Sequence, residues 1–201
     1  MVTTSTETTK NADKITSSAL DLFKKKGYDK VTVSEICNDA SVGRSSFYAV
    51  FSGKADIIAH MMDRVKPDFN ELMPEFLKAP NDFERIMMLT NSYLKLAEFY
   101  GPDIVRVIIR MELSGKTHFL KAIYSFNDWL TQLIINCQCN NIIGNKSPAP
   151  ELLHIQFDIA EAELYAWVSA DGSWSLTDRV RSRFYTLLEV NPEYRRSTNE
   201  T

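Results

Sequence analysis

The sequence predicts an all-α protein. Apolar side chains recur three or four positions apart along most of the chain, which is the spacing of one face of a helix. No segment shows the regular two-residue alternation of a half-buried strand. At 201 residues and 44% hydrophobic composition, the chain can form a buried core without disulfides. This length fits one large domain, or a small domain fused to a larger one.

The first nine residues are mostly Thr and Ser, so we expect residues 1–9 to form a disordered arm. A first helix is predicted over 11–26. Its last turn carries three lysines, and Gly27 is placed to end it. One face of this helix collects its apolar residues, Ile15, Ala19, Leu22 and Phe23.

Two short helices follow. Thr32 and Glu35 have the spacing of a capping box, which predicts a helix over 33–40 with Ile36 and Ala40 facing inward. After a turn at 41–43, a further helix is expected to run to about residue 49. Two short helices joined by such a turn are typical of a helix-turn-helix, whose second helix enters the major groove of DNA.

The later segments are longer. We expect helices at 54–66, 81–99, 103–113, 116–139, 150–170 and 176–190, separated by proline, glycine and asparagine stops. Two domains and a tail follow the arm in this order: a helix-turn-helix DNA-binding domain at 10–54, a ligand-binding and dimerisation domain at 55–190 and a C-terminal tail at 191–201.

Charge and cysteine content restrict the class of protein. The net charge is −3, but residues 1–54 carry eight Lys/Arg against six Asp/Glu, net +2, and the remainder carries 15 against 20, net −5. With no signal peptide, no membrane span and three cysteines without regular spacing, we expect a cytoplasmic protein. Cys137 and Cys139 form C-x-C, but no histidine or carboxylate pattern accompanies them, so we expect no metal and no cofactor.

One stretch has a recognisable pattern: ITSSALDLFKKKGYDKVTVSEICNDASVGRSSFYAVFSGKADII, residues 15–58. It resembles the DNA-binding region of the tetracycline-repressor (TetR) family of bacterial regulators. The resemblance implies an all-α homodimer with a three-helix DNA-binding head and a larger ligand-binding, dimerising body. The sequence departs from the family in two ways. Ser41 stands where Gly is usual and Gly43 where Ser is the usual cap, and Val50 replaces a frequent histidine. If Ser41 adopts positive φ, its backbone is strained.

The predicted second helix of the helix-turn-helix motif offers donors for DNA. Arg44 can contact guanine in a bidentate manner, and Ser45 is short enough for close approach of the backbone to the groove. The hydroxyls of Ser46, Tyr48 and Thr32 suit phosphates, as does Lys54 at the start of the next helix. The resemblance places Phe47 and Phe51 in the core.

The body is rich in Met and aromatic residues, which line apolar pockets and also fill ordinary cores. We expect the ligand-binding residues to include Met62, Met88, Tyr93, Met111, His118, Phe119 and Trp129, with Arg110 and Asn127 as further polar candidates. The last two helices carry more apolar surface than one body is expected to bury. A second copy would cover it, as in the family, through Leu153, Ile159, Leu164, Trp167, Val180, Phe184 and Leu187.

The function expected from the resemblance is a ligand-responsive transcriptional regulator, most often a repressor in this family. It would bind a pseudo-palindromic double-stranded operator as a homodimer and leave it when a small molecule binds. The alternatives are a helical small-molecule carrier or enzyme without DNA function, and a DNA-binding architectural protein that senses nothing. Against an enzyme, no H-E-x-x-H, G-x-S-x-G, P-loop or G-x-G-x-x-G motif occurs.

Overall fold

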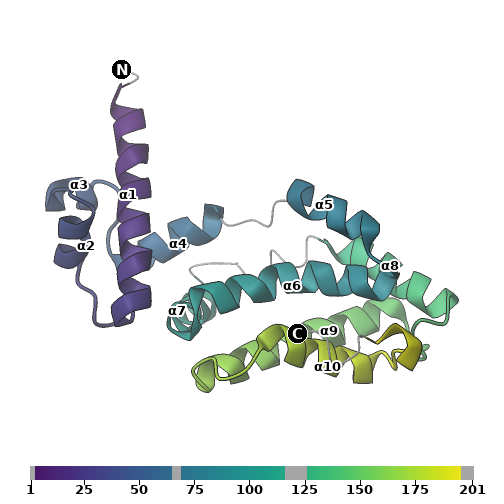
Figure 1. The fold of residues 1–201 in the computed structure, drawn as a ribbon. Coiled ribbons are helices and arrows are strands. Elements are labelled where there is room, and N and C mark those ends of the chain that lie inside the picture. Colours follow the sequence, from purple (N-terminus) through teal and green to yellow (C-terminus); the bar gives the residue numbers. More distant parts are fainter. Residues whose placement is uncertain (1–2, 65–68, 116–125, 196–201) are drawn as a thin grey trace. The chain divides into compact units, whose positions relative to one another are not determined.

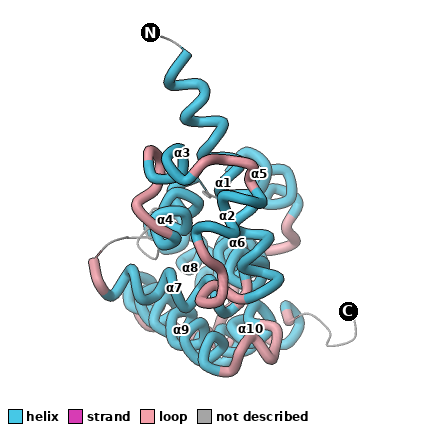
Figure 2. Tube along the Cα trace, turned by 90° about the vertical axis from the view of Figure 1, so that its left-hand side faces the viewer, coloured by secondary structure: helices cyan, strands magenta, loops and turns pink. Residues whose placement is uncertain are grey.

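A computed structural model of the chain describes residues 3–64, 69–115 and 126–195. Within these ranges every regular element is a helix, and the only β-type pairing is an isolated bridge between Ile143 and Val190. Figure 2 shows helices joined by loops. The all-α prediction is confirmed. None of the described helices is long and apolar enough to cross a membrane.

The described helices fall into two compact units. The first, which we call the head unit, consists of α1 (Thr3–Lys26), α2 (Val33–Asp39), α3 (Arg44–Tyr48), α4 (Lys54–Arg64) and α7 (Pro102–Leu113). Helix α1 packs on α2, α3 and α4, and α2 and α3 lie on one side of it (Figure 1). The centre of this unit is apolar and fully buried, with Ile15, Ile36, Phe47 and Ile57 each 0% exposed.

The second, the body unit, consists of α5 (Phe69–Lys78), α6 (Asp82–Tyr100), α8 (Asn127–Cys139), α9 (Ala149–Ser169), α10 (Leu176–Leu187) and the short 3-10 helix η2 (Pro192–Tyr194). Helix α6 packs against α8 and α10, and α9 packs against the same two helices. Figure 1 shows α9 and α10 running side by side in green and yellow.

The unit boundaries differ from the expected division at residue 54. Helices α4 and α7 group with α1–α3, although α7 lies far away in sequence. The start of α7 lies close to Gly27, the residue that follows α1. Asp103 Oδ2 is 3.2 Å from the position that a Cβ of residue 27 would occupy, and Gly27 has φ +83°. A side chain at residue 27 would therefore be disfavoured both by its backbone conformation and by this close approach.

Helix α1 begins earlier than predicted. Residues 3–9 were expected to be disordered, but α1 starts at Thr3. Extending an existing helix adds one backbone hydrogen bond for each residue fixed and avoids the cost of nucleation, so a Thr-rich composition need not end it. Residues 8–10 of α1 are exposed, so they add no buried surface to the core.

Several predicted helix ends are confirmed. Gly101 ends α6 with φ +82°, the Asn81 side chain accepts a hydrogen bond from Glu84 N, and the Ser175 hydroxyl accepts one from Asp178 N. Helix α5 was not predicted. It contains Pro74 in its interior, a residue that removes one backbone hydrogen bond and normally argues against a helix.

Two acidic side chains of α6 hold α10 in the body unit. Glu84, which is 3% exposed, accepts two hydrogen bonds from the Arg181 guanidinium, at 2.5 and 3.1 Å. Near the other end of α6, Glu98 Oε1 accepts from Leu176 N at 2.6 Å and satisfies an amide at the start of α10. Charges and amides that would be costly to bury alone are thereby paired.

Candidate nucleic-acid interface

Helix α3 presents one polar face to solvent. Arg44, Ser45 and Tyr48 are exposed, and Ser46 is half-buried. On a helix, positions 44 and 48 lie above one another and position 45 lies about 100° away, so the three exposed side chains share one face. None of the hydrogen bonds or ion pairs described for the chain engages Arg44 or Tyr48, although the Tyr48 ring packs edge-on against Phe47.

Phe47 fixes the orientation of that face. Its side chain is 0% exposed and points to the core of the head, where its ring centroid lies 6.0 Å from that of Phe51. Phe51 is also buried, which confirms the core positions expected for both rings. Phe47 is the only buried residue of the five in α3. Its packing in the core therefore prevents the helix from turning about its axis and keeps the polar face toward solvent.

The turn before α3 has a defined backbone. Ser41 has φ +54°, in the left-handed region, and two hydrogen bonds end α2 around it: Val42 N donates to Cys37 O and Ser41 N to Asn38 O. This is the Schellman pattern, in which a left-handed residue follows the last helical turn. Gly43 then precedes α3 with extended φ and ψ and supplies no capping side chain. The strain expected at Ser41 is present in the structure.

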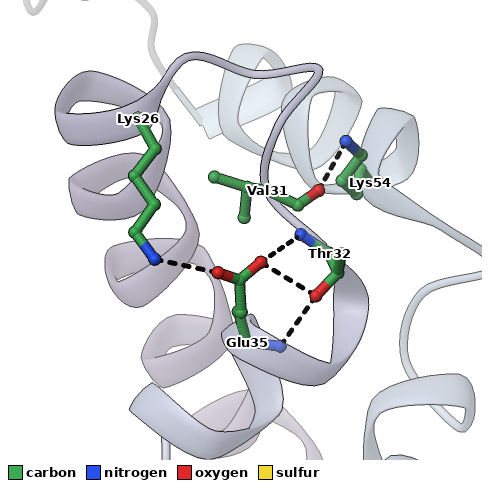
Figure 3. Close-up of polar contacts among 5 residues, drawn as sticks. All are labelled: Lys26, Val31, Thr32, Glu35 and Lys54. Carbon is green, nitrogen blue, oxygen red and sulfur yellow. Dashed lines mark hydrogen bonds and ion pairs between the residues drawn. The ribbon is translucent and has the colours of Figure 1, made fainter.

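A capping box starts α2, as predicted. Glu35 N donates to the Thr32 hydroxyl at 3.2 Å, and Thr32 N donates to Glu35 Oε2 at 2.8 Å (Figure 3). The Thr32 hydroxyl also donates to Glu35 Oε2, at 2.9 Å. A hydroxyl has a single hydrogen to donate, and the Thr32 hydroxyl donates it to Glu35. It therefore has no hydrogen left for the phosphate contact predicted from the sequence.

Lys26 completes this cluster. Its ammonium lies 2.8 Å from Glu35 Oε1, so the end of α1 is joined to the start of α2. The hydrogen bond from Lys26, followed by those from the Thr32 backbone and hydroxyl, lowers the pKa of Glu35 to about 2. The sequence indicated the capping box, but not this link across nine residues.

Lys54 is held within the head. Its ammonium donates to Tyr28 O at 2.6 Å and to Val31 O at 2.7 Å, and lies 4.5 Å from the centroid of the Tyr28 ring. Figure 3 shows the contact with Val31. Burial lowers the pKa of Lys54. Lys54, which was predicted to bind a phosphate, therefore connects the start of α4 to the segment between α1 and α2.

Comparison with known proteins identifies the helix-turn-helix segment. Residues 15–61 match the family model described as "Bacterial regulatory proteins, tetR family". This segment is therefore a DNA-binding region of the TetR type. The match spans α2, α3, the second half of α1 and most of α4, which carry the face and the anchors described above. No curated protein matches the sequence significantly.

Solved structures of TetR-type regulators share the fold. The fatty acid degradation regulator FadR from Bacillus halodurans superposes with a TM-score of 0.60 at 19% identity, covering 92% of this chain and 97% of that one. FadR from Thermus thermophilus, in complex with lauroyl-CoA, gives 0.56 at 16% identity and covers 94% and 98%. FadR from Bacillus subtilis, in complex with stearoyl-CoA, gives 0.58 at 16% identity and covers 87% and 96%.

The predicted ligand-binding residues are spread over both units. Met62 on α4 and Met111 on α7 are buried in the head unit. In the body unit, Tyr93 is buried and Met88 half-buried on α6, whereas Trp129 on α8 is 48% exposed, with its ring centroid 6.1 Å from that of Phe76. His118 and Phe119 lie outside the described residues.

The predicted dimer residues are mostly core residues. Val180, Phe184, Trp167, Leu153 and Leu164 are between 0 and 8% exposed within one chain, so they have almost no surface left for a second copy. Only Ile159 and Leu187 are half-buried. The expected surplus of apolar surface is largely used inside the body itself, because α9 and α10 pack against each other and against α8 and α6.

The C-x-C pair lies on α8 and splits between two sides of the helix. Cys137 is buried, which raises the pKa of its thiol to about 12, whereas Cys139 is exposed. Two thiols on different sides of a helix cannot bind one metal ion without partners from elsewhere. In the described part of the chain, no group of three or more His, Cys, Asp or Glu residues could hold a metal ion.

Proposed function

We propose that this protein is a ligand-responsive transcriptional repressor that binds a pseudo-palindromic operator as a homodimer and leaves it when a small molecule binds the body. The observation that carries the proposal is the exposed face of α3, held in place by buried Phe47. The family match supports the same conclusion, because it covers the helices that build this face.

Four side chains of α3 are proposed to contact DNA. Arg44 is free to make the bidentate contact with guanine O6 and N7, the commonest specific contact in the major groove. Ser45 allows close approach, while the Ser46 and Tyr48 hydroxyls suit phosphates. Thr32 and Lys54 are left out of this set, because both are engaged within the head.

The second copy is proposed to dock on the outer face of α9. Ile155, Ile159, Ala162 and Ala166 are exposed or half-buried and follow one another at intervals of three or four residues, so they form one apolar stripe. Small alanines within such a stripe allow two helices to approach closely. A dimer with a two-fold axis through this contact would present two symmetry-related α3 faces, one for each half-site of a pseudo-palindrome.

The effector is proposed to bind in the body unit near α6, where Met88 and Tyr93 offer soft and aromatic surface. Two of the structurally similar FadR proteins bind lauroyl-CoA and stearoyl-CoA. Acyl-CoA thioesters are therefore the first effectors to test. Release follows if the ligand prefers a body conformation in which two α3 faces no longer match their half-sites.

The proposal is tested by selecting DNA from a fragmented genome of the source organism with the purified full-length chain. Retained fragments should share a pseudo-palindrome whose half-sites are about 34–36 Å apart, or a multiple of one helical turn. Binding of the selected site should weaken steeply with salt, and lauroyl-CoA titrated into the complex tests release. Retention of random fragments with no shared motif would reject a sequence-specific regulator.

A further inference from the structure

Glu35 joins three hydrogen-bond donors at the start of α2. Its Oε1 accepts from the Lys26 ammonium at 2.8 Å, while its Oε2 accepts from Thr32 N at 2.8 Å and from the Thr32 hydroxyl at 2.9 Å (Figure 3). The donors belong to the last residue of α1 and to the residue that precedes α2. Both carboxylate oxygens are therefore occupied inside the head, by groups whose chemistry equally suits a phosphate.

The Lys26 ammonium and the Glu35 carboxylate both remain in contact with solvent. The side chain of Lys26 is 50% exposed and that of Glu35 is 37% exposed. An exposed ion pair adds little to stability, because water screens the attraction and two long side chains must be held in one geometry. Stability alone is thus a weak reason for this contact, and its two charges are accessible to a partner in solution.

The pair lies at the start of the helix that a DNA backbone is expected to approach. In a helix-turn-helix the first helix crosses the sugar–phosphate backbone, while the second enters the major groove. Here the first helix is α2, and its seven residues span only about 10 Å. A charge at its start therefore lies within about one Debye length, roughly 10 Å at 0.1 M salt, of the phosphates that α2 would cross.

Glu35 keeps its negative charge at neutral pH. The hydrogen bond from Lys26, followed by those from the backbone and hydroxyl of Thr32, lowers its pKa to about 2. Nearby phosphates would raise this pKa, but from a value far below neutrality, so the carboxylate stays ionised. The charge also reaches Lys54: burial lowers the pKa of Lys54, and the charges of Asp29 and Glu35 oppose this effect.

The donors at the start of α2 are turned toward the protein. The Thr32 hydroxyl donates to Glu35, and the Lys54 ammonium donates to two backbone carbonyls. The Lys26 ammonium donates to Glu35. Since one carboxylate balances one ammonium, this pair presents no net charge to a phosphate, whereas Lys26 without Glu35 would present one positive charge.

We propose that Glu35 holds Lys26 away from the DNA backbone and thereby lowers the affinity of the head for DNA of any sequence. This role rests on the proposed DNA-binding function. Contacts to phosphates carry no base preference, so the Lys26–Glu35 pair weakens the sequence-independent part of binding. Binding then depends more on the base contact proposed for Arg44.

A double-mutant cycle of Glu35→Gln and Lys26→Met tests this role, with the full-length protein titrated against a random-sequence duplex between about 50 and 200 mM salt. Gln suits a capping box as Glu does, so Glu35→Gln keeps an acceptor for Thr32 and removes the charge that holds Lys26. The slope of log K against log salt concentration should steepen by about two units per dimer, one phosphate contact for each chain. The affinity of Glu35→Gln relative to wild type should then be about tenfold greater at the lower salt concentration than at the higher one.

The remaining variants show whether Lys26 carries the gain. Lys26→Met alone should leave the slope unchanged, and the double variant should return to the wild-type slope. Asp39→Asn, at the exposed last residue of α2, is the matched control, because it removes a carboxylate of the same helix and no lysine in the described part of the chain is paired with it. Its slope should stay within about half a unit of wild type.

Three results would overturn the role of Glu35: a wild-type slope in Glu35→Gln, a slope that falls by about two units in Lys26→Met, or a steeper slope that persists in the double variant. A purely structural loss gives the first result, since it lowers affinity at every salt concentration alike. The second can be measured even if Glu35→Gln is too unstable to titrate. A wild-type protein that binds no DNA would instead refute the proposed function itself, so the two failures are distinguishable.

Discussion

Lys54 shows how one side chain can have two opposite interpretations. Its position at the first residue of α4 favours a phosphate contact, because a helix start and an ammonium both attract anions. In the structure, two of its three N–H donors go to Tyr28 O and Val31 O. Backbone carbonyls carry no sequence signal, so no pattern could have indicated these acceptors.

The two interpretations differ in what Lys54→Met changes. Loss of two charge-assisted hydrogen bonds should lower stability by about 2 kcal/mol, while the salt dependence of DNA binding should stay the same. Thermal unfolding and binding titrations at several salt concentrations measure both. Lys25→Met, at an exposed position in the last turn of α1, serves as control. If Lys54→Met is as stable as wild type and the slope of log K against log salt concentration falls by about two units per dimer, Lys54 contacts phosphate instead.

Glu35 makes the head sensitive to acid. Its pKa in the folded protein is about 2, below the ordinary value of 4.5, mainly because of Lys26. A lowered folded-state pKa means that ionised Glu35 stabilises the fold above about pH 4.5 and that this contribution disappears as the pH falls toward 2. Glu35→Gln should thus be less stable than wild type at pH 7, and the difference should shrink between pH 5 and 2.

Thermal unfolding at constant ionic strength across this range measures the difference. Glu75→Gln, which removes an exposed carboxylate of α5, is the control substitution. If the difference between Glu35→Gln and wild type is independent of pH, Glu35 does not contribute in the way its contacts indicate.

At the scale of elements, the turn between α2 and α3 is less stable than it could be. Ser41 occupies the left-handed region at φ +54°, while Gly43 caps α3 without a side chain. Ser41→Gly should stabilise the protein by about 0.5–1 kcal/mol, and Gly43→Ser should add a few tenths through a capping hydroxyl. The new Cβ fits, since its nearest neighbour would be 3.7 Å away.

Denaturant unfolding of the two single variants and the double variant tests this prediction. Gly43→Ala provides the control, because it adds the Cβ without the hydroxyl. Destabilisation by Ser41→Gly would show that residue 41 does not adopt the left-handed conformation in solution.

The sequence predicted most helices because their caps and apolar faces are local features. Gly27, Asn81 and Ser175 act at the expected ends. It failed where a local rule is overridden: Pro74 lies inside α5, and the Thr-rich start continues α1. The grouping of α7 with the head could not be predicted either, since it depends on the close approach of Gly27 and Asp103, far apart in the sequence.

Over the whole molecule, the residues predicted to contact DNA are mostly exposed, whereas those predicted to contact a second copy are mostly buried within one chain. The residues proposed to contact DNA fall in a short segment with a family pattern, and Arg44, Ser45 and Tyr48 are exposed. An apolar residue on a helix face, by contrast, looks the same in sequence whether it packs within one chain or between two. Phe184 and Val180 belong to the first kind.

This distinction predicts different outcomes for two substitutions. Phe184→Ala should cost about 3–5 kcal/mol of folding stability, because it opens a cavity in the core. Ala162→Glu, on the exposed stripe of α9, should leave the fold intact but separate the dimer, because it places an unpaired charge in the contact. Light scattering should give twice the chain mass of 23.0 kDa for wild type and once for Ala162→Glu. Dimers of Ala162→Glu at low micromolar concentration would refute the α9 contact.

Contact between the exposed face of α3 and DNA bases is proposed to occur through Arg44. It is tested most directly by titrating Arg44→Ala against the selected operator and its single base-pair variants at fixed salt. We predict a loss of about 1–3 kcal/mol in binding and a relaxed preference at one base pair in each half-site. Unchanged affinity together with unchanged base preference would contradict it.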